Sequence, residues 1–564
     1  MSGGSDVTGQ VRVSTLVGRT MAALGVGHVF GVVGSGNFDV TSTLMAEGIP
    51  FTAARHEGGA ATMADAYGRM SGRVGVVTTH QGCGLTNAIT GVGEAAKSRT
   101  PMIVLTADTQ AAATRSNFKI NQDALARSVG AVAERIHSPA TAIADTVRAF
   151  RTAVNERRTV VLSLPLDVQS ATAADEVGAV VVPQPSVTRP DTAAVEKLVA
   201  LLAAAERPVF VAGRGGRGAR NEILALAQHA GALVATSAVA SGLFNGDPHN
   251  LGISGGFSSP LTAELISGAD LIVGWGCTLN MWTMRHGRLI SAGTTVVQVD
   301  VEDSSLGANR PISLGVLGDS GLTAVDALAV LRSSQPEPAE KYRTEANALA
   351  IKGGSRWRDV ETPDLSTAES IDPRELTREL DTLLPAERIV SVDSGNFMGY
   401  PSQYLAVPDE FGFCFTQAFQ AIGLGLYTAI GAAVAQPGRL PVLGAGDGGF
   451  LMGISELETA VRMKLPLVCI VYNDAAYGAE VHHFAGQHSG QDLASVVFPD
   501  TDIAAIARGF GADGVTVRSV ADLAAIQPWL EAYDAGTQDR PLVIDAKIAS
   551  DGGSWWLAEA FQGH

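Results

Sequence analysis

The sequence predicts an α/β protein of three domains, each built on a doubly wound parallel sheet. The chain has 564 residues, of which 46% are apolar and 17% charged, a composition typical of a folded protein with more than one hydrophobic core. Short apolar runs alternate with helical patterns along most of its length, and this alternation favours parallel sheets covered by helices. Breaks in the pattern predict domains at 1–182, 190–335 and 366–564.

The first domain is indicated by the apolar runs HVFGVVG, VGVVTTHQG, MIVLTAD and TVVLSLPLDV. The segment VVPQPSVTRPD (181–191) follows them, and its three prolines are typical of a linker. The runs RPVFVAG, ADLIVGWG and TTVVQVDV repeat the rhythm in the second domain. A polar, charged stretch (333–364) then connects to the third domain.

The third domain opens with IDPRELTRELDTLL, which predicts a helix. Asp372 suits the N-cap, Pro373 the first turn and Glu375 the capping-box position. The strand-like runs RIVSVDSG, LPVLGAGD, LPLVCIVYN and RPLVIDAKI follow. We therefore expect the same strand-helix alternation here as in the other two domains.

Charge and cysteine content narrow the class of protein. A net charge of −17 and a pI near 5.1 argue against binding to nucleic acid or to anionic membranes. The four cysteines have no CxxC spacing, which excludes the usual zinc patterns and fits a reducing compartment. The N-terminus has no signal-peptide pattern, and no run of about 18 apolar residues occurs. We expect a cytoplasmic protein.

The most informative motif is GAGDGG, which ends one predicted strand, and Asn473, which ends the next. The segment between them has apolar residues at helical spacing, so Asp447 and Asn473 are expected side by side at the carboxyl edge of one β-α-β unit. Their oxygens suit Mg²⁺, which takes one or two side chains and leaves places for phosphate and water. Gly446, Gly448 and Gly449 would let the backbone approach a phosphate.

Two other nucleotide-binding motifs are excluded, because no GK[ST] follows the glycines and GxGxxG spacing is missing. A bare Gly-Asp-Gly is most often only a tight turn. Here it is followed by 24 residues and then Asn473, and this combination resembles the signature of thiamine-diphosphate-dependent enzymes. The similarity extends over nearly the whole chain and includes acetohydroxyacid synthases, benzoylformate decarboxylases and 2-hydroxyacyl-CoA lyases.

The resemblance implies roles for particular residues of the third domain. Asp447, Asn473 and the backbone carbonyl of Ala475 would hold Mg²⁺ and, through it, the cofactor diphosphate. Ile422 would be the apolar wedge under the bent cofactor, and Gly423 would offer a carbonyl to its pyrimidine ring. The further residues expected at the cofactor are Gly395, Asn396, Phe397, Ala476, Tyr477 and Gly478.

The segment RHEGGAATMADAYGR resembles the family's catalytic-glutamate segment, and it places Glu57 at the cofactor's aminopyrimidine ring. Taken alone, Glu57 is more often a carboxylate favoured by a helix N-terminus. Because Glu57 and Asp447 lie in different domains, the resemblance implies active sites between subunits, and hence a homo-oligomer, either a dimer or a tetramer.

The substrate is indicated by four positions. Ser35 and His80 match residues of benzoylformate decarboxylases, and His80 is a candidate for proton transfer. Gln122 matches an amide of the synthases, whereas Asn121 departs from the family. Glu480, His482 and His483 follow the metal segment without an assigned role, and exposed histidines are often inert.

The expected function is the cleavage or formation of a C–C bond next to a carbonyl, by decarboxylation or carboligation of a 2-oxo acid through an enamine. A 2-hydroxyacyl-CoA lyase, with an aldehyde or acyl-CoA substrate, and a silent regulatory homologue remain alternatives. FAD or ADP in the central domain stays open, with Arg214 and Arg217 as candidate phosphate contacts. The C-terminal DGGSWWLAEAFQGH (551–564) could pack as a lid.

Overall fold

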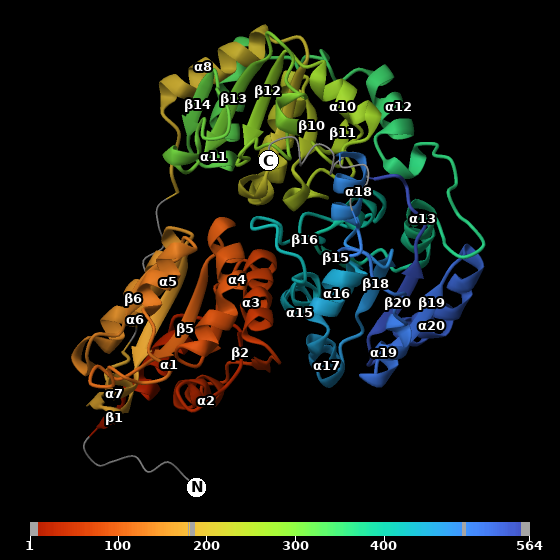
Figure 1. The fold of residues 1–564 in the computed structure, drawn as a ribbon. Helices are drawn as coiled ribbons and strands as arrows, with labels where there is room; N and C mark the ends of the chain where they lie inside the picture. Colours follow the sequence, from red (N-terminus) through yellow and green to blue (C-terminus); the bar gives the residue numbers. More distant parts are fainter. Residues whose placement is uncertain (1–8, 179, 181–186, 488–491, 554–564) are drawn as a thin grey trace.

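The computed structural model describes residues 9–178, 180, 187–487 and 492–553. Within these residues the chain forms three six-stranded parallel sheets and one two-stranded antiparallel sheet. Figure 1 shows each large sheet between helices, with the central domain lying above the first and third domains. The predicted fold class is therefore confirmed. The central strands are buried on both faces, which explains their nearly continuous apolar sequences.

The first sheet has the strand order β3-β2-β4-β5-β7-β6. Its strands are β2 (Val29–Gly31), β3 (Phe51–Ala53), β4 (Gly75–Thr79), β5 (Met102–Asp108), β6 (Val132–Arg135) and β7 (Thr159–Pro165). The helices are α1 (Val13–Ala23), α2 (Phe38–Ala46), α3 (Glu57–Ser71), α4 (Cys83–Lys97), α5 (Gln122–Ser128), α6 (Ala142–Asn155) and α7 (Leu166–Ser170). β1 (Gln10–Arg12) and β8 (Thr172–Ala174) form the two-stranded sheet beside them.

The second sheet has the order β11-β10-β9-β12-β13-β14. Its strands are β9 (Pro208–Ala212), β10 (Leu233–Thr236), β11 (Asn250–Ile253), β12 (Leu271–Trp275), β13 (Thr295–Asp300) and β14 (Leu314–Leu317). The helices are α8 (Thr192–Ala204), α9 (Arg220–Ala230), α10 (Pro260–Ser267) and α11 (Ser320–Ser334). The polar connection expected from the sequence contains a helix, α12 (Glu345–Gly354), whose Ile351 is buried against this domain.

The third sheet has the order β16-β15-β17-β18-β20-β19. Its strands are β15 (Arg388–Val392), β16 (Phe413–Phe415), β17 (Leu440–Gly446), β18 (Val468–Asn473), β19 (Asp513–Val517) and β20 (Leu542–Lys547). The helices are α13 (Pro373–Leu383), α14 (Gly399–Tyr404), α15 (Gly425–Ala435), α16 (Asp447–Gly453), α17 (Ser455–Arg462), α18 (Gly478–Gln487), α19 (Ile503–Gly509) and α20 (Gln527–Asp534).

Each sheet has a point at which the chain changes sides. It lies between β2 and β4 in the first sheet, between β9 and β12 in the second, and between β15 and β17 in the third. Counted within their own domains, the strands of the first and third sheets follow one order, and those of the second follow another. Ligands of open α/β sheets bind beyond the carboxyl ends of the strands at such points.

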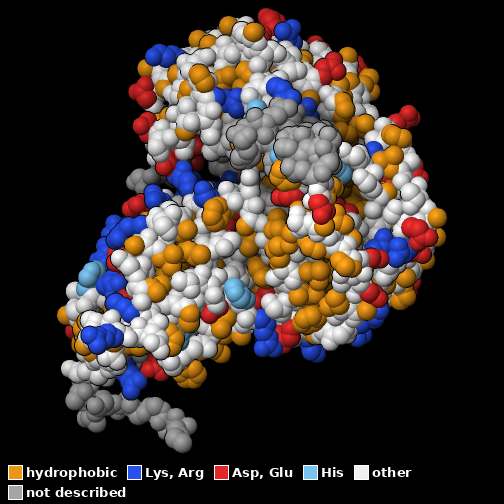
Figure 2. All heavy atoms as spheres, viewed as in Figure 1, with side chains coloured by type: hydrophobic (Ala, Val, Ile, Leu, Met, Phe, Trp, Pro, Cys, Tyr) orange, Lys and Arg blue, Asp and Glu red, His pale blue; other side chains and the backbone are white. Residues whose placement is uncertain are grey.

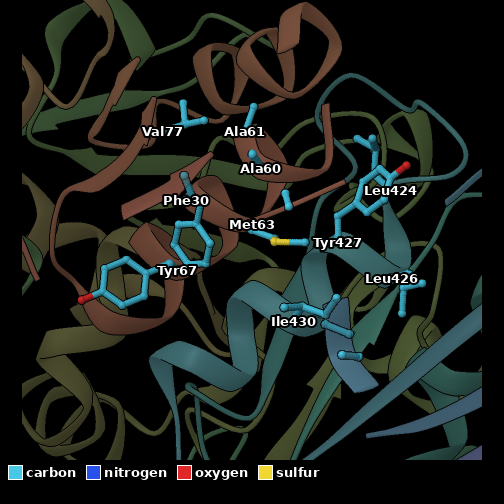
Figure 3. Packing of buried hydrophobic residues seen from close by; sticks show 14 of the residues in the cluster. Phe30, Ala60, Ala61, Met63, Tyr67, Val77, Leu424, Leu426, Tyr427 and Ile430 are labelled. Atoms are coloured by element: carbon cyan, nitrogen blue, oxygen red, sulfur yellow. The ribbon is translucent and has the colours of Figure 1, made fainter. Parts of the chain in front are cut away.

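Helices α3 and α15 join the first and third domains into one continuous hydrophobic core, as Figure 3 shows. Met63 of α3 points toward Tyr427 and Ile430 of α15, whereas Tyr67 packs beside Phe30 (5.9 Å between ring centroids). A Cβ atom on Gly431 would lie 2.2 Å from the carbonyl oxygen of Met63, so the close approach of the two helices requires glycine there. This packing fixes the first domain against the third.

Two local features refine the sequence analysis. Asp372 caps α13 by accepting a hydrogen bond from the N–H of Arg374 (2.8 Å). The predicted capping box is wrong, because the N–H of Asp372 donates to Ser366 Oγ (2.9 Å) and Glu375 pairs with Arg378 (2.5 Å). Among the described helices, none has the length and apolar character needed to span a bilayer.

Candidate active site

Asp447 and Asn473 lie side by side, as the motif predicts. β17 and β18 are parallel neighbours in which Gly446 is opposite Tyr472, so the residues that follow these two come next to each other. Asp447 is the first residue of α16, and Asn473 is the last residue of β18. Both are buried, with 6% and 4% of their surface exposed.

The carboxylate of Asp447 has capacity left for a cation. Its Oδ1 atom is buried and has no hydrogen-bond partner among the described residues. Burial raises the pKa of Asp447 to about 6, because removing a carboxylate from water disfavours its charged form. An unpartnered carboxylate oxygen beside an amide oxygen suits a hard divalent cation such as Mg²⁺.

The amide of Asn473 is held by a neighbouring strand. Its Nδ2 donates to Asp545 Oδ1 (2.8 Å), and its Oδ1 accepts from the N–H of Ala475 (3.0 Å). Asp545 is fully buried on β20 and also contacts Lys547 Nζ at 3.0 Å. Asp545 thus determines which end of the Asn473 amide is left for a ligand, a role that the motif alone did not reveal.

Asp474 is a second carboxylate at this place. Burial and the adjacent carboxylate of Asp447 raise the pKa of Asp474 to about 7. A nearby cation favours the charged forms of two carboxylates this close, so the donor set fits Mg²⁺. The sequence held the signal for Asp474, since it directly follows Asn473.

The turn after β18 carries the other expected metal and cofactor residues. Ala475 has a φ of +53°, and its carbonyl oxygen accepts from the N–H of Phe498 (2.7 Å), which leaves one lone pair for another partner. Ala476 forms an isolated bridge with Val497. The ring of Tyr477 stands edge-on to Phe498, with their centroids 4.9 Å apart.

The glycines of this region permit close packing of the loops at the switch point. A Cβ atom on Gly449 would lie 2.4 Å from Asp393 Oδ2, and one on Gly448 would lie 2.6 Å from the ring of Tyr477. Phe397 stacks on Tyr472 at 5.6 Å. The expected phosphate-contacting residues that line this packed region are Gly395, Asn396, Phe397, Gly446, Gly448, Gly449 and Gly478.

Asp393 connects the strand end of β15 to the segment that holds the predicted wedge. Both of its carboxylate oxygens accept from the N–H of Gly423 (3.1 Å each), and burial raises the pKa of Asp393 to about 6. Ile422 precedes Gly423 and is 39% exposed. This large apolar side chain lies before α15 (Gly425–Ala435) and is not part of the buried helix core.

Glu57 is the first residue of α3 and directly follows the turn after β3. Its Oε2 atom accepts a hydrogen bond from Asn87 Nδ2 (3.0 Å). The side chain also reaches α4, since a Cβ atom on Gly84 would lie 3.4 Å from Glu57 Oε1. Glu57 therefore combines the helix N-terminal position of the simpler interpretation with an orientation fixed by Asn87.

Ser35 and His80 meet at the switch point of the first sheet. Ser35 Oγ lies 3.5 Å from His80 Nε2, at the outer limit of a hydrogen bond. His80 Nδ1 lies 3.0 Å from the carbonyl oxygen of Gln81, so a neutral ring carries its hydrogen on Nδ1 and leaves Nε2 as an acceptor. The ring stands edge-on to Phe118, with their centroids 4.8 Å apart.

Gln122 is buried and uses its amide within the first domain. Its Oε1 accepts from the N–H of Gly82 (2.9 Å), and its Nε2 donates to the carbonyl oxygen of Ala107 (3.1 Å) and to Ser163 Oγ (3.3 Å). Only 2% of its surface is exposed. These contacts make Gln122 a support for the turn before α4 and for the ends of two neighbouring strands.

The two halves of the predicted site are not joined within this chain. Among the described residues, no hydrogen bond or ion pair links Glu57 or His80 to Asp447, Asn473 or Asp474. The first and third domains instead meet through α3, α15 and α17. Within one chain, the Glu57 half and the Asp447 half of the predicted site are therefore separate groups of side chains.

A cavity of about 560 Å³ lies where the three domains meet, at the switch point of the central sheet. Figure 2 shows Lys and Arg side chains gathered where the central domain faces the first domain. The cationic side chains that line the cavity are Arg69, Lys97, Arg99, Arg157 and Arg214, and the third domain contributes Ile422 and Glu480. The cavity therefore combines positive charge with the predicted wedge.

Arg214 and Arg217 differ in their surroundings. Arg214 has no hydrogen bond or ion pair within the described ranges, and burial near other arginines lowers its pKa to about 9. Arg217 donates to the backbone carbonyls of Arg69 (3.1 Å) and Val239. Arg214 is thus available for an anion, whereas Arg217 joins the central domain to the first.

Glu480, the two histidines after it and the C-terminal tail had no assigned role or only a proposed one in the sequence. Glu480 lies in α18 and faces the cavity. His483 contacts the ring of Phe484 at 4.8 Å, and His482 adjoins Gly553. Most of the tail that was expected to act as a lid, 554–564, lies outside the described residues.

Comparison with known proteins defines the family to which this chain belongs. Residues 11–127 match the N-terminal TPP binding domain of thiamine pyrophosphate enzymes, 195–328 match their central domain, and 393–546 match their C-terminal TPP binding domain. The chain belongs to the thiamine pyrophosphate enzyme family. The resemblance carried by Glu57, Asp447 and Asn473 is therefore confirmed at the level of the family.

Relatives with three different activities align over almost their whole length. A sulfoacetaldehyde acetyltransferase of Castellaniella defragrans is 29% identical over 93% of this chain and 91% of its own. A probable 2-ketoarginine decarboxylase of Pseudomonas aeruginosa is 29% identical, over 91% and 90%. A putative acetolactate synthase large subunit of Mycobacterium tuberculosis is 30% identical, over 89% and 91%. The family thus defines the cofactor more closely than the substrate.

Proposed function

We propose that this protein uses thiamine diphosphate and Mg²⁺ to cleave or form a C–C bond next to a carbonyl, acting on a 2-oxo acid by decarboxylation, carboligation or both. The observation that carries the proposal is the unpartnered Oδ1 of Asp447 beside the oriented amide of Asn473. The relatives named above, an acetyltransferase, a probable decarboxylase and a putative synthase, support a shared donor chemistry.

Each residue has a definite part in this proposal. Asp447, Asn473 and the carbonyl of Ala475 hold Mg²⁺, and Asp474 adds negative charge to that place. The glycines of the two switch-point loops would admit the diphosphate, and Ile422 and Gly423 would support the rings of the cofactor. When bound, thiamine diphosphate supplies a carbon that adds to carbonyls and accepts the electron pair released when the C–C bond breaks.

Glu57 would share a proton with a ring nitrogen of the aminopyrimidine and so assist removal of a proton from the cofactor, while Asn87 keeps its carboxylate in place. His80 is the proposed proton carrier near the substrate, with Nε2 available beside Ser35. Because Glu57 and Asp447 make no contact in one chain, we assign each site to two subunits, with Glu57 of one chain facing Asp447 of another. This arrangement requires at least a homodimer.

A panel of 2-oxo acids, aldehydes and 2-hydroxyacyl-CoAs, with products identified by mass spectrometry, tests the proposal. We expect turnover of a 2-oxo acid that requires both thiamine diphosphate and Mg²⁺. Glu57→Gln should bind the cofactor yet lose most of the activity. A protein that turns over none of the panel, with Glu57 and Asp447 intact, would favour a silent regulatory homologue instead.

The cationic cavity favours a second candidate, the 2-hydroxyacyl-CoA lyase. Arg214, which has no partner among the residues that the structure describes, lies beside Arg99 and Arg157 and suits the phosphates of acyl-CoA, ADP or FAD equally. Calorimetric titration with CoA, ADP and FAD distinguishes these ligands. Arg214→Met should weaken the binding of whichever ligand binds. If none of the three binds, the acyl-CoA candidate is contradicted and the 2-oxo acid remains as the proposed substrate.

A further inference from the structure

We propose that Glu456, a residue of the third domain, is a positioning residue for Glu57 of the same chain. The inference rests on the proposed function of Glu57. It concerns the turn between β3 and α3, from which the carboxylate of Glu57 projects. Glu456 lies in α17, which follows α16 and its first residue, Asp447, along the chain.

The carboxylate of Glu456 binds the backbone immediately before Glu57. Its Oε1 atom accepts hydrogen bonds from the N–H of Arg55 (2.8 Å) and from the N–H of His56 (2.9 Å). Glu456 is fully buried, with 0% of its surface exposed. Hydrogen bonds to a charged acceptor in a buried place are stronger than those between neutral groups, so this carboxylate determines the path of the turn.

The carboxylate is itself held in place. Thr459 Oγ1 donates to Glu456 Oε2 at 2.6 Å. A Cβ atom on Gly59 would lie 2.8 Å from Glu456 Oε1, so the approach of the carboxylate to the first turn of α3 depends on glycine at that position. The N-terminus of a helix favours a negative charge, which also suits this arrangement.

Glu57 is therefore fixed from two sides. Asn87 holds the tip of its side chain (3.0 Å), and Glu456 holds the backbone that carries it. Without the Glu456 carboxylate, two buried N–H groups lose their acceptor, and the turn must rearrange to satisfy them. A displacement of about 1 Å at a reacting group can cost about 100-fold in rate.

The same contact between the domains offers a matched control. Arg55 Nε pairs with Glu458 Oε2 (2.6 Å), and Arg462 donates to the carbonyl oxygen of Ala53 (2.6 Å). The Arg55–Glu458 pair is partly exposed, with 54% and 29% of the two side chains accessible. Glu458→Ala removes this link between the domains but leaves both bonds of Glu456 intact.

The experiment measures two quantities in the holoenzyme: the exchange rate of the C2 proton of bound thiamine diphosphate, by NMR after acid quenching, and the affinity for thiamine diphosphate, by fluorescence titration. Glu456→Ala should slow the exchange about 100-fold, with the affinity changed no more than about threefold. Glu456→Gln keeps an oxygen acceptor and should exchange within about threefold of wild type. Glu458→Ala should match wild type in both quantities.

Glu57→Gln separates this inference from the proposed function. If Glu57→Gln leaves the exchange unchanged, the proposed function fails. If it slows the exchange while Glu456→Ala does not, only the positioning role fails. Equal slowing by Glu456→Ala and Glu458→Ala would also overturn it, since domain contact alone would then explain the effect. If Glu456→Ala does not fold, Thr459→Val provides the test, because it removes the hydrogen bond that holds the Glu456 carboxylate. We expect Thr459→Val to slow the C2 proton exchange about fivefold. An unchanged exchange rate would contradict the positioning role of Glu456.

Discussion

Asp545 Oδ1 accepts a hydrogen bond from Asn473 Nδ2 at 2.8 Å, and this bond orients the amide of the proposed metal site. The two residues lie on neighbouring strands, β20 and β18, in parallel register. Asp545 is fully buried and balanced by Lys547 at 3.0 Å. Because the amide nitrogen of Asn473 is engaged, its carbonyl oxygen is the atom left to face a cation.

Asp545→Asn should therefore weaken Mg²⁺ binding, although Asp545 itself is not among the residues proposed to bind the metal. Losing a partner that orients a metal ligand typically costs about 10- to 100-fold in metal affinity. Thiamine diphosphate titrations at graded Mg²⁺ concentrations measure this change. Asp513→Asn, on the adjacent strand β19, is the control and should leave the affinity unchanged. Equal affinities for Asp545→Asn and wild type would contradict the orienting role.

Asp447→Asn should stabilise the cofactor-free protein while abolishing its response to the cofactor. The buried Oδ1 has no hydrogen-bond partner in the described part of the chain, so removing the charge should raise the free energy of unfolding by about 1–2 kcal/mol. Thermal unfolding with and without Mg²⁺ and thiamine diphosphate provides the measurement. Wild type should gain stability on ligand addition, because only the folded state binds. A similar gain in the variant would exclude Asp447 from the metal site.

Ile422→Ala should separate activity from stability. Ile422 is 39% exposed, so its truncation should cost less than about 1 kcal/mol of stability but lower kcat/KM about tenfold or more, because the cofactor loses its apolar support. Ile430, fully buried in α15, is the control, and Ile430→Ala should cost about 2–5 kcal/mol. Unchanged kcat/KM for Ile422→Ala would remove Ile422 from the proposed site.

His28 should make the protein less stable in acid. Burial lowers the pKa of His28 to about 4 from its ordinary 6.5, so in that pH range the unfolded chain binds more protons and stability falls as pH falls. Between about pH 7 and about pH 5 the loss through His28 is about 2 kcal/mol. Urea unfolding of wild type and His28→Gln at both pH values checks this. The wild type should lose more, and parallel losses would assign acid sensitivity to other groups.

The fold class and the position of the metal motif could be predicted because both depend on local patterns. Apolar runs at strand spacing and the capped helix at Asp372 are readable from adjacent residues. The neighbouring positions of Asp447 and Asn473 followed from one β-α-β unit, whose parallel strands must end at the same edge. Asp474 was missed although it follows Asn473 directly, since its meaning depends on its proximity to the Asp447 carboxylate.

Contacts between distant segments could not be predicted in the same way. Gln122 has the amide that the family resemblance suggested, yet its three hydrogen bonds join Gly82 to Ala107 and Ser163 within the first domain. Asp545 and Glu456 carry no motif, and their partners lie 72 and 400 residues away in the chain. Only the folded arrangement reveals that they hold Asn473 and the turn before Glu57.

The sequence by itself determined the three α/β domains, the family and the residues that could bind a metal and a diphosphate, because strand periodicity and glycine-acid motifs act over short ranges. Tertiary structure decided which way those residues point, as Asp545 does for Asn473 and Glu456 for the turn that carries Glu57. It also decided that Arg214 faces a cavity while Arg217 does not. Orientation is set by buried hydrogen bonds between segments, and such bonds exist only once the sheets have packed.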